Sequence, residues 1–132
     1  MTYLLKSEPS VYSFDQLLAD KTTVWDGIKN PQALITLRNM KRGEDCIIYH
    51  SNEGKAAVGT AKVASVKLAP PTPPSKLPTP IVTLRAGKRL KRPKSLDEIR
   101  AAPVFKDSLL FRQFRLSVVP LTDDQYNWLI AG

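Results

Sequence analysis

Few side chains in this sequence could act as a nucleophile or a general base. The chain has one histidine, His50, and one cysteine, Cys46, which lies in an apolar run and is expected to be a buried thiol. Ser51 follows His50 directly, but consecutive side chains of a strand point to opposite faces, so the two do not form a nucleophile–base pair. The six glycines are isolated and form neither a P-loop nor a nucleophile elbow. We therefore expect no catalytic residue, and an enzyme that processes nucleotides with His50 as acid or base is an alternative.

The same residues are too few to hold a metal ion. Structural zinc sites take four Cys or His ligands, and calcium or magnesium sites take several oxygen ligands, often from carboxylates. The acidic residues of this chain do not cluster in such a pattern. The sequence therefore predicts no metal site and no cofactor.

Three short segments, at residues 6–9, 25–27 and 49–52, instead place hydroxyl, amide and charged groups beside aromatic rings. An aromatic face stacks on a nucleic-acid base with about 1–3 kcal/mol per base, while fixed donors and acceptors read the base edge. Trp25 lies in a polar segment rather than in an apolar period, so we expect its ring to face a cavity and not to belong to the core. The candidate pocket residues are Lys6, Ser7, Trp25, Asp26, Asn30, Tyr49, His50, Ser51 and Asn52.

Basic residues exceed acidic ones along the chain and give a formal net charge of +8 at pH 7. Such a charge attracts polyanions, among them nucleic acids. The excess is concentrated between Lys76 and Lys106, where nine basic residues stand against two acidic ones. The densest cluster is expected to contact phosphate groups, and its members are Lys88, Arg89, Lys91, Arg92 and Lys94.

Capping patterns mark the starts of the helices that must position these residues. Short helices are predicted from Ser13 to about Leu18, from Ser95 to about Ala101 and from Thr122 to about Ile130. Each opens with a capping box, in which Ser or Thr is followed three residues later by Gln or Glu. A further helix begins at Asn30, which is followed by a proline suited to the first helical position, and Gly43 ends it.

Apolar and alternating runs between these helices predict strands at 3–5, 45–50, 57–66, 81–84 and 115–119. Residues 51–54 have the composition of a hairpin turn, and the proline-rich residues 70–80 are expected to form an extended surface connector. Strands and short helices without regular βαβ alternation predict an α+β fold. We expect a single domain over residues 1–132 with a curved or closed sheet.

Four motifs of the sequence resemble those of the EVE domain family, in the family's order. They are YLLKSEP at residues 3–9, TVWDGIKN at 23–30, YHSN at 49–52 and RLSVVP at 115–120. The match runs over essentially the whole chain. On this resemblance the sequence is identified as a member of the EVE domain family, which lies in the PUA-like superfamily with the YTH and ASCH domains.

The resemblance implies a PUA-like barrel with a deep pocket that binds modified bases in DNA or RNA. It implies that the first motif contacts a base or phosphate, that Trp25 forms an aromatic wall, and that residues 49–52 form the opposite rim. It adds Arg115 beneath the pocket, as a support or a backbone contact. The sequence departs from the family pattern at Pro31 and Leu34, where relatives carry an aromatic and a basic residue, so we expect fewer phosphate contacts from this helix.

The sequence therefore predicts a non-catalytic module that reads a single modified base, such as a modified cytosine in DNA or a modified base in RNA. Besides the enzyme that uses His50, two alternatives stay open: a general RNA-binding domain without base selectivity, and a pocket for a free nucleoside. No apolar run reaches the roughly 20 residues that span a bilayer, and the first residues do not have the pattern of a signal peptide. We expect a cytoplasmic monomer that contacts no membrane.

Overall fold

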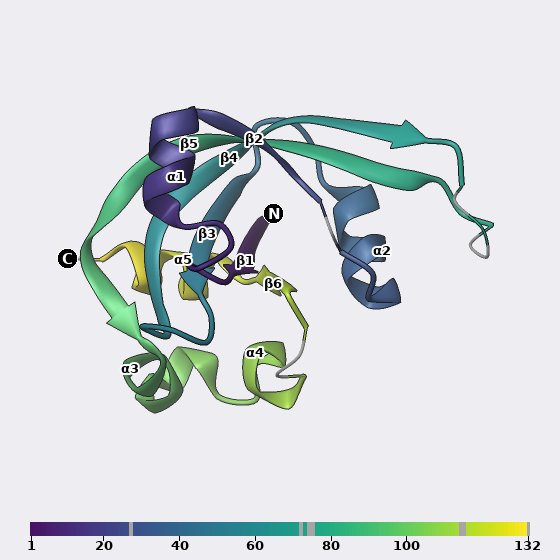
Figure 1. Ribbon diagram of the computed structural model, residues 1–132. Helices are drawn as coiled ribbons and strands as arrows, with labels where there is room; N and C mark the ends of the chain where they lie inside the picture. The colour runs from purple at the N-terminus through teal and green to yellow at the C-terminus, as the bar shows by residue number, and fades with distance from the viewer. Residues whose placement is uncertain (27, 72, 74–75, 114–115, 132) are drawn as a thin grey trace.

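Six strands form one mixed sheet in the computed structural model, which describes residues 1–26, 28–71, 73, 76–113 and 116–131 (Figure 1). The strands are β1 (Thr2–Ser7), β2 (Thr22–Trp25), β3 (Asp45–His50), β4 (Ala56–Ala69), β5 (Thr79–Ser95) and β6 (Val118–Leu121). Their order in the sheet is β2-β5-β4-β3-β1-β6. Among these pairs only β1 and β3 run parallel. Because β2 and β6 remain at the two edges, the sheet is curved but not closed into a barrel.

The parallel pair β1 and β3 forms the centre of the core and brings two polar segments together. Leu4, Leu5 and Ile48 of this pair are at most 1 % exposed, because both strands lie inside the sheet and are covered on both faces. Parallel strands end at the same edge of a sheet. Ser7 at the end of β1 therefore lies opposite His50 at the end of β3.

Short helices cover the sheet and confirm the predicted capping boxes at Ser13, Ser95 and Thr122. They are α1 (Phe14–Asp20), α2 (Pro31–Asn39), α3 (Leu96–Ala101), α4 (Leu109–Arg112) and α5 (Asp123–Ile130), with a 3-10 turn η1 (Pro103–Phe105). The Asn30 side chain accepts hydrogen bonds from the backbone N–H groups of residues 32 and 33, as expected of a cap. The sequence did not predict η1 or α4, and α2 ends before Gly43 is reached.

Among the described residues, no helix is both long and apolar enough to cross a membrane.

Strands β4 and β5 are longer than predicted. The end of β4 and the start of β5 extend together as a two-stranded ribbon that passes α2 (Figure 1). Shifts in their pairing register bend both strands, and two of the three shifts lie on either side of Gly59. A Cβ atom added at Gly59 would lie 2.1 Å from Cζ of Phe14, so the Phe14 ring packs directly on the β4 backbone. This contact fixes α1, and with it the loop between β1 and α1, over the sheet.

Strand β6 differs from the predicted strand 115–119, because it begins at Val118 and includes Pro120. Pro120 has no N–H group, but β6 is an edge strand that pairs only with β1, and edge strands tolerate proline.

Candidate base-binding site

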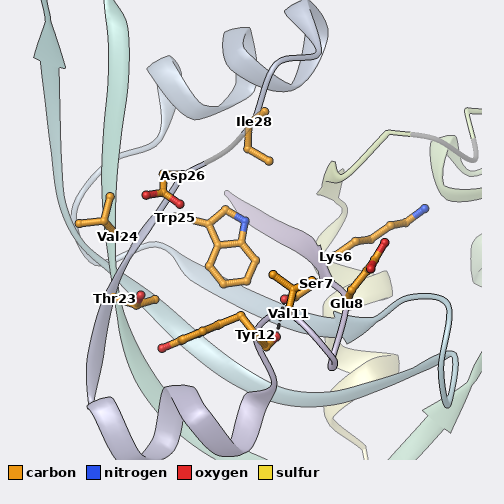
Figure 2. Close-up of a pocket in the computed structure, with 10 residues that line it drawn as sticks. All are labelled: Lys6, Ser7, Glu8, Val11, Tyr12, Thr23, Val24, Trp25, Asp26 and Ile28. Atoms are coloured by element: carbon orange, nitrogen blue, oxygen red, sulfur yellow. Dashed lines mark hydrogen bonds between the residues drawn. The ribbon is translucent and has the colours of Figure 1, made fainter.

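Two neighbouring cavities lie where β1 ends. The first, of about 610 Å³, is lined by Lys6, Ser7, Glu8, Val11, Tyr12, Thr23, Val24, Trp25, Asp26 and Ile28 (Figure 2). The second, of about 490 Å³, is lined by Lys6, Glu8, Tyr49, Ser51, Asn52, Lys55 and Ser117. Lys6 and Glu8 belong to both linings, so these two side chains mark the boundary between the cavities. The residues expected to form one pocket therefore divide between two.

The indole ring of Trp25 is the main aromatic surface of the first cavity. Figure 2 shows it in the middle of the lining side chains, with Lys6 and Glu8 on one side and Val24 and Asp26 on the other. The Tyr12 ring meets it edge-on, with centroids 6.5 Å apart and planes at 81°. Trp25 thus lines a cavity, and its role as an aromatic wall for a base stays a prediction. The expectation that it lies outside the core was wrong, because the residue is only 8 % exposed and ends strand β2 within the buried cluster.

A tight turn holds Tyr12 and the rim of the first cavity. The Glu8 carbonyl accepts hydrogen bonds from the backbone N–H groups of Val11 (2.9 Å) and Tyr12 (2.8 Å). The Ser7 hydroxyl donates to the Tyr12 carbonyl at 2.5 Å. The Tyr12 hydroxyl donates to Oδ2 of Asp20 at 2.8 Å. Burial raises the pKa of Tyr12, and so the phenol is a neutral donor at physiological pH.

Charged groups lie at the boundary and at the outer rim. Burial lowers the pKa of Lys6, whose backbone N–H donates to the Ser117 carbonyl at 2.9 Å. The carboxylates of Glu8 and Asp26 are exposed on opposite sides of the first cavity (Figure 2). Carboxylates accept hydrogen bonds and cannot donate them when ionised. The first cavity therefore offers an aromatic surface between acceptors.

The turn between β3 and β4 shapes the second cavity. The backbone N–H of Ser51 donates to the Ser7 carbonyl at 2.9 Å, and Nδ2 of Asn52 donates to Oε1 of Glu8 at 2.5 Å. The Lys55 carbonyl accepts from the first N–H of α3, that of Leu96, at 2.8 Å. This turn is therefore tied both to the end of β1 and to α3.

Three of the predicted pocket residues lie outside both linings or outside the described residues. His50 lines neither cavity. Its Nε2 accepts a hydrogen bond from the Phe14 backbone N–H at 3.0 Å, so this ring nitrogen is occupied by a contact within the protein. Burial lowers the pKa of His50 and Asp15 opposes this effect, so the ring is neutral near pH 7. Asn30 caps α2 and lines neither cavity. Arg115 lies outside the described residues.

Comparison with known proteins decides the family. A model of the EVE domain matches residues 1–131. The chain belongs to the EVE domain family. Thymocyte nuclear protein 1 of Rattus norvegicus is 32 % identical to this EVE domain over 164 residues, which cover 98 % of the chain and 72 % of the relative.

Solved structures of relatives have the same fold. A protein from Rhodopseudomonas palustris superimposes on this EVE domain with a TM-score of 0.86 at 35 % identity, covering 98 % of this chain and 90 % of that one. Human THYN1, solved in complex with DNA containing 5-methylcytosine, gives a TM-score of 0.85 at 29 % identity, covering 98 % and 95 %. The α+β, PUA-like fold expected from the sequence is therefore confirmed.

The predicted basic cluster of this EVE domain lies on strand β5. Lys88, Arg89, Lys91 and Arg92 are exposed, and none of them is among the residues that line the two cavities. Arg89 pairs with Asp15 at 2.5 Å, and Arg92 pairs with Glu98. We call these four residues the β5 cation row.

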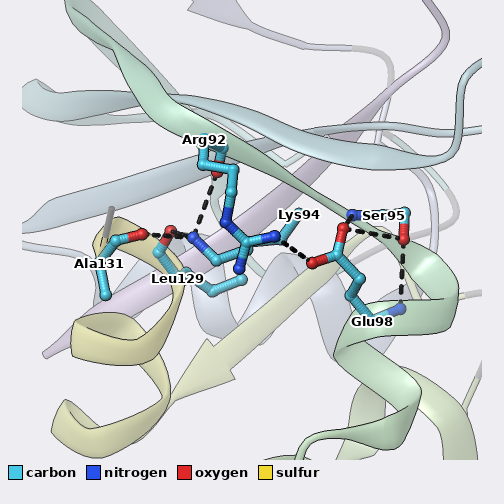
Figure 3. Close-up of polar contacts among 6 residues, drawn as sticks. All are labelled: Arg92, Lys94, Ser95, Glu98, Leu129 and Ala131. Carbon is cyan, nitrogen blue, oxygen red and sulfur yellow. Dashed lines mark hydrogen bonds and ion pairs between the residues drawn. The ribbon is translucent and has the colours of Figure 1, made fainter.

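Lys94 does not belong to this row, which corrects the expectation that it contacts phosphate. Its side chain is 2 % exposed because β5 turns it toward the interior, beside the end of α5 (Figure 3). Its Nζ donates to the carbonyls of Arg92 (3.2 Å), Leu129 (3.4 Å) and Ala131. Burial lowers the pKa of Lys94, and the neighbouring Arg92 adds to the effect.

Sequence reasoning missed several lining residues of this EVE domain. They are Glu8, Val11, Tyr12, Thr23, Val24, Ile28, Lys55 and Ser117. Glu8, Thr23, Val24, Ile28 and Ser117 lie inside motifs that the sequence analysis quoted, and Val11 and Tyr12 follow the first of these motifs closely, so their positions in the chain could have pointed to them. Lys55 lies outside the motifs, and only the folded sheet brings it to the end of β1. Among the described residues, no three His, Cys, Asp or Glu side chains gather in a group that could hold a metal ion.

Proposed function

We propose that this EVE domain binds DNA that carries a modified base such as 5-methylcytosine, and that the base enters the first cavity. The observation that carries the proposal is the Trp25 ring, which lines a cavity of about 610 Å³ next to fixed polar groups. The human relative in complex with DNA containing 5-methylcytosine supports the choice of ligand.

The side chains around Trp25 suit the three parts of a modified cytosine. The ring face stacks on an aromatic side chain, which is worth about 1–3 kcal/mol per base. The 5-methyl group needs an apolar neighbour, and Val11, Val24 and Ile28 line the same cavity. The exocyclic amino group needs an acceptor, a role for which Glu8 and Asp26 are the carboxylates at hand.

A base enters such a cavity only after it has left the stack. The unstacking costs a few kcal/mol, and enclosure of the base offsets it. The proposal includes no chemical step: the side chains hold the base, and His50 orients the start of α1 through the Phe14 N–H group.

The β5 cation row favours a second candidate, which is general nucleic-acid binding without base selectivity. Exposed lysine and arginine side chains attract phosphates of any sequence, and this attraction falls steeply with salt. In this reading the affinity is the same for modified and unmodified strands.

A binding titration separates the two candidates. Fluorescently labelled DNA strands of one sequence, with cytosine or 5-methylcytosine at the centre, are titrated by anisotropy in single- and double-stranded form, and matched RNA strands are included. The proposal expects tighter binding of the methylated DNA, and it expects Trp25→Ala to remove that preference. Trp128→Phe is the matched control, because Trp128 packs edge-on against Phe105 at 5.7 Å and lines neither cavity. Equal affinity for both strands in the wild-type protein would support the second candidate instead.

A further inference from the structure

The second cavity differs in chemistry from the first. Its lining includes two lysines, Lys6 and Lys55, and two serines, Ser51 and Ser117, which bring ammonium and hydroxyl groups to this part of the molecule. Among the described residues of the lining, the one aromatic residue is Tyr49, which is 3 % exposed and so offers less open surface to a base than Trp25 at 8 %. Ammonium and hydroxyl donors around a small cavity are groups that bind phosphate oxygens in protein–nucleic acid complexes.

The turn that carries Lys55 is held in an uncommon conformation. Asn52 has a φ of 65° and Lys55 a φ of 26°, which are values that side chains other than glycine rarely adopt. Hydrogen bonds hold the turn on both sides, from Ser51 to the Ser7 carbonyl and from Leu96 to the Lys55 carbonyl. Backbone strain of this kind persists only where the surrounding structure imposes it, and it gathers at ligand-binding positions.

The charge balance of the second cavity favours an anion. Among the described residues of its lining, Glu8 is the single carboxylate, against two lysines. Its Oε1 already accepts a hydrogen bond from Asn52 at 2.5 Å, which holds that oxygen on the turn. The described lining residues therefore carry an excess of one positive charge, which together with the two serines suits a group with a single negative charge such as a phosphodiester.

Among the described residues, the two linings share Lys6 and Glu8, which lie at the boundary between the cavities. We propose that the second cavity binds the phosphate of the nucleotide whose base occupies the first cavity, with Lys55 as the residue that pairs with the phosphate. The inference rests on the proposed function, because it places base and phosphate of one nucleotide in adjacent cavities. It assigns stacking to Trp25 and anion binding to the turn between β3 and β4.

The test removes the charge of one phosphate at a time. Short single strands with one 5-methylcytosine carry either natural phosphodiesters or a neutral methylphosphonate on the 5′ or the 3′ side of that base. For the wild-type protein we expect binding about tenfold weaker for one of the two methylphosphonate strands, the loss of one charged hydrogen bond. In Lys55→Met this penalty disappears. Lys91→Met, the same change in the β5 cation row, keeps it.

The preference for methylated DNA and the binding of free nucleotides show which of the two proposals holds. If Lys55→Met retains the full methylphosphonate penalty while preferring methylated DNA as the wild type does, the phosphate site is wrong and the proposed function stands. If the wild type shows no preference for methylated DNA, the proposed function fails and the inference fails with it. Free 5-methyl-2′-deoxycytidine and its 5′- and 3′-monophosphates are titrated in parallel. A preference for the monophosphates that depends on Lys55, without a penalty on strands, would assign the site to free nucleotides and overturn the placement of a DNA phosphate.

Discussion

Trp25 has two physical roles in one side chain, and both follow from its size. Its ring is buried in the core cluster and still lines the first cavity, beside Tyr12. An indole buries 150–250 Å² of surface on average, which is enough to pack on one side and stack on the other. Changes at this residue must therefore be judged by affinity and stability together.

Trp25→Ala is expected to lower the free energy of unfolding by about 3 kcal/mol, the low end for a buried tryptophan, because the residue already borders a cavity. Trp25→Phe keeps an aromatic surface and is expected to cost less in both stability and affinity. Urea unfolding and anisotropy titrations on the same preparations measure the two effects. If Trp25→Ala unfolds like the wild type, Trp25 is not part of the core. If folded Trp25→Ala binds methylated DNA with wild-type affinity, the ring does not contact the base.

His50 gives a pH dependence whose sign can be worked out. Its neutral Nε2 accepts the Phe14 N–H, and burial lowers its pKa below the ordinary value of about 6.5 while the carboxylate of Asp15 opposes the shift. The stability that it contributes is complete above the unfolded-state pKa. This stability is lost as the pH falls through the lower pKa of the folded state.

We therefore expect the wild-type protein to lose more stability than His50→Gln between neutral pH and about pH 5, since glutamine offers an acceptor that does not titrate. Urea unfolding at a series of pH values measures the difference. Parallel curves for the two proteins would show that the imidazole contributes nothing to the acid sensitivity of the fold.

At the scale of elements, the helix starts could be predicted from capping residues in the sequence, whereas the length of β5 could not. Three capping boxes and the Asn30 cap are local signals, set by side chains within three residues of the helix start. β5 is also a strand through its basic half, where the residues that turn inward are Leu90 and Lys94. A lysine in the place of an apolar residue hides the alternation that marks a strand, and only the carbonyls at the end of α5, distant in sequence, explain why it is buried.

Lys94 joins β5 to α5 through those carbonyls, so its ammonium group stabilises two elements at once (Figure 3). Lys94→Met keeps the aliphatic stem and removes the donors. We expect it to lower the free energy of unfolding by about 1–3 kcal/mol, because buried carbonyls lose their partner.

Lys91→Met is the control for that change, because Lys91 is exposed on the same strand. It should leave the unfolding curve unaltered. Thermal or urea unfolding of both variants decides the matter, and equal stability of the two would contradict the role given to Lys94.

Over the whole molecule, the sequence predicted which segments come together, but not that their residues line two cavities instead of one pocket. The ends of β1 and β3 come together because the two strands are parallel neighbours, and the Trp25 segment joins them by way of β2. Whether these segments form one pocket or two depends on where the Lys6 and Glu8 side chains lie. Side-chain placement of this kind follows from tertiary packing, which the spacing of residues along the chain does not encode.

Base reading and phosphate attraction should be separable across the molecule, since the β5 cation row lies outside both linings. Replacing Lys88 and Lys91 by Met is expected to lower the affinity for methylated and unmethylated strands equally. It should also flatten the dependence of log affinity on log salt by about 0.9 for each phosphate contact removed from double-stranded DNA. Titrations at several salt concentrations measure both quantities. A loss of discrimination with an unchanged salt slope would reverse the roles assigned to the row and the cavities.

Asn52→Gly is the complementary change, because glycine accepts the positive φ of this position while the amide is lost. It removes the hydrogen bond that holds Glu8, the carboxylate proposed to accept from the amino group of the base, so we expect weaker binding of methylated and unmethylated strands alike with the salt slope unchanged. If the salt slope falls as well, Asn52 acts on the backbone contacts and not on the base.

The central claim is that a modified base stacks on Trp25, and the fluorescence of that ring tests it most directly. The chain has two tryptophans, so Trp128→Phe leaves Trp25 as the sole indole emitter. Titrated with methylated and unmethylated strands of one sequence, this variant should show saturable quenching with tighter binding for the methylated strand, because a stacked base quenches the indole it covers. Binding of the methylated strand by anisotropy with no change in Trp25 emission would contradict the account, since the base would then lie elsewhere.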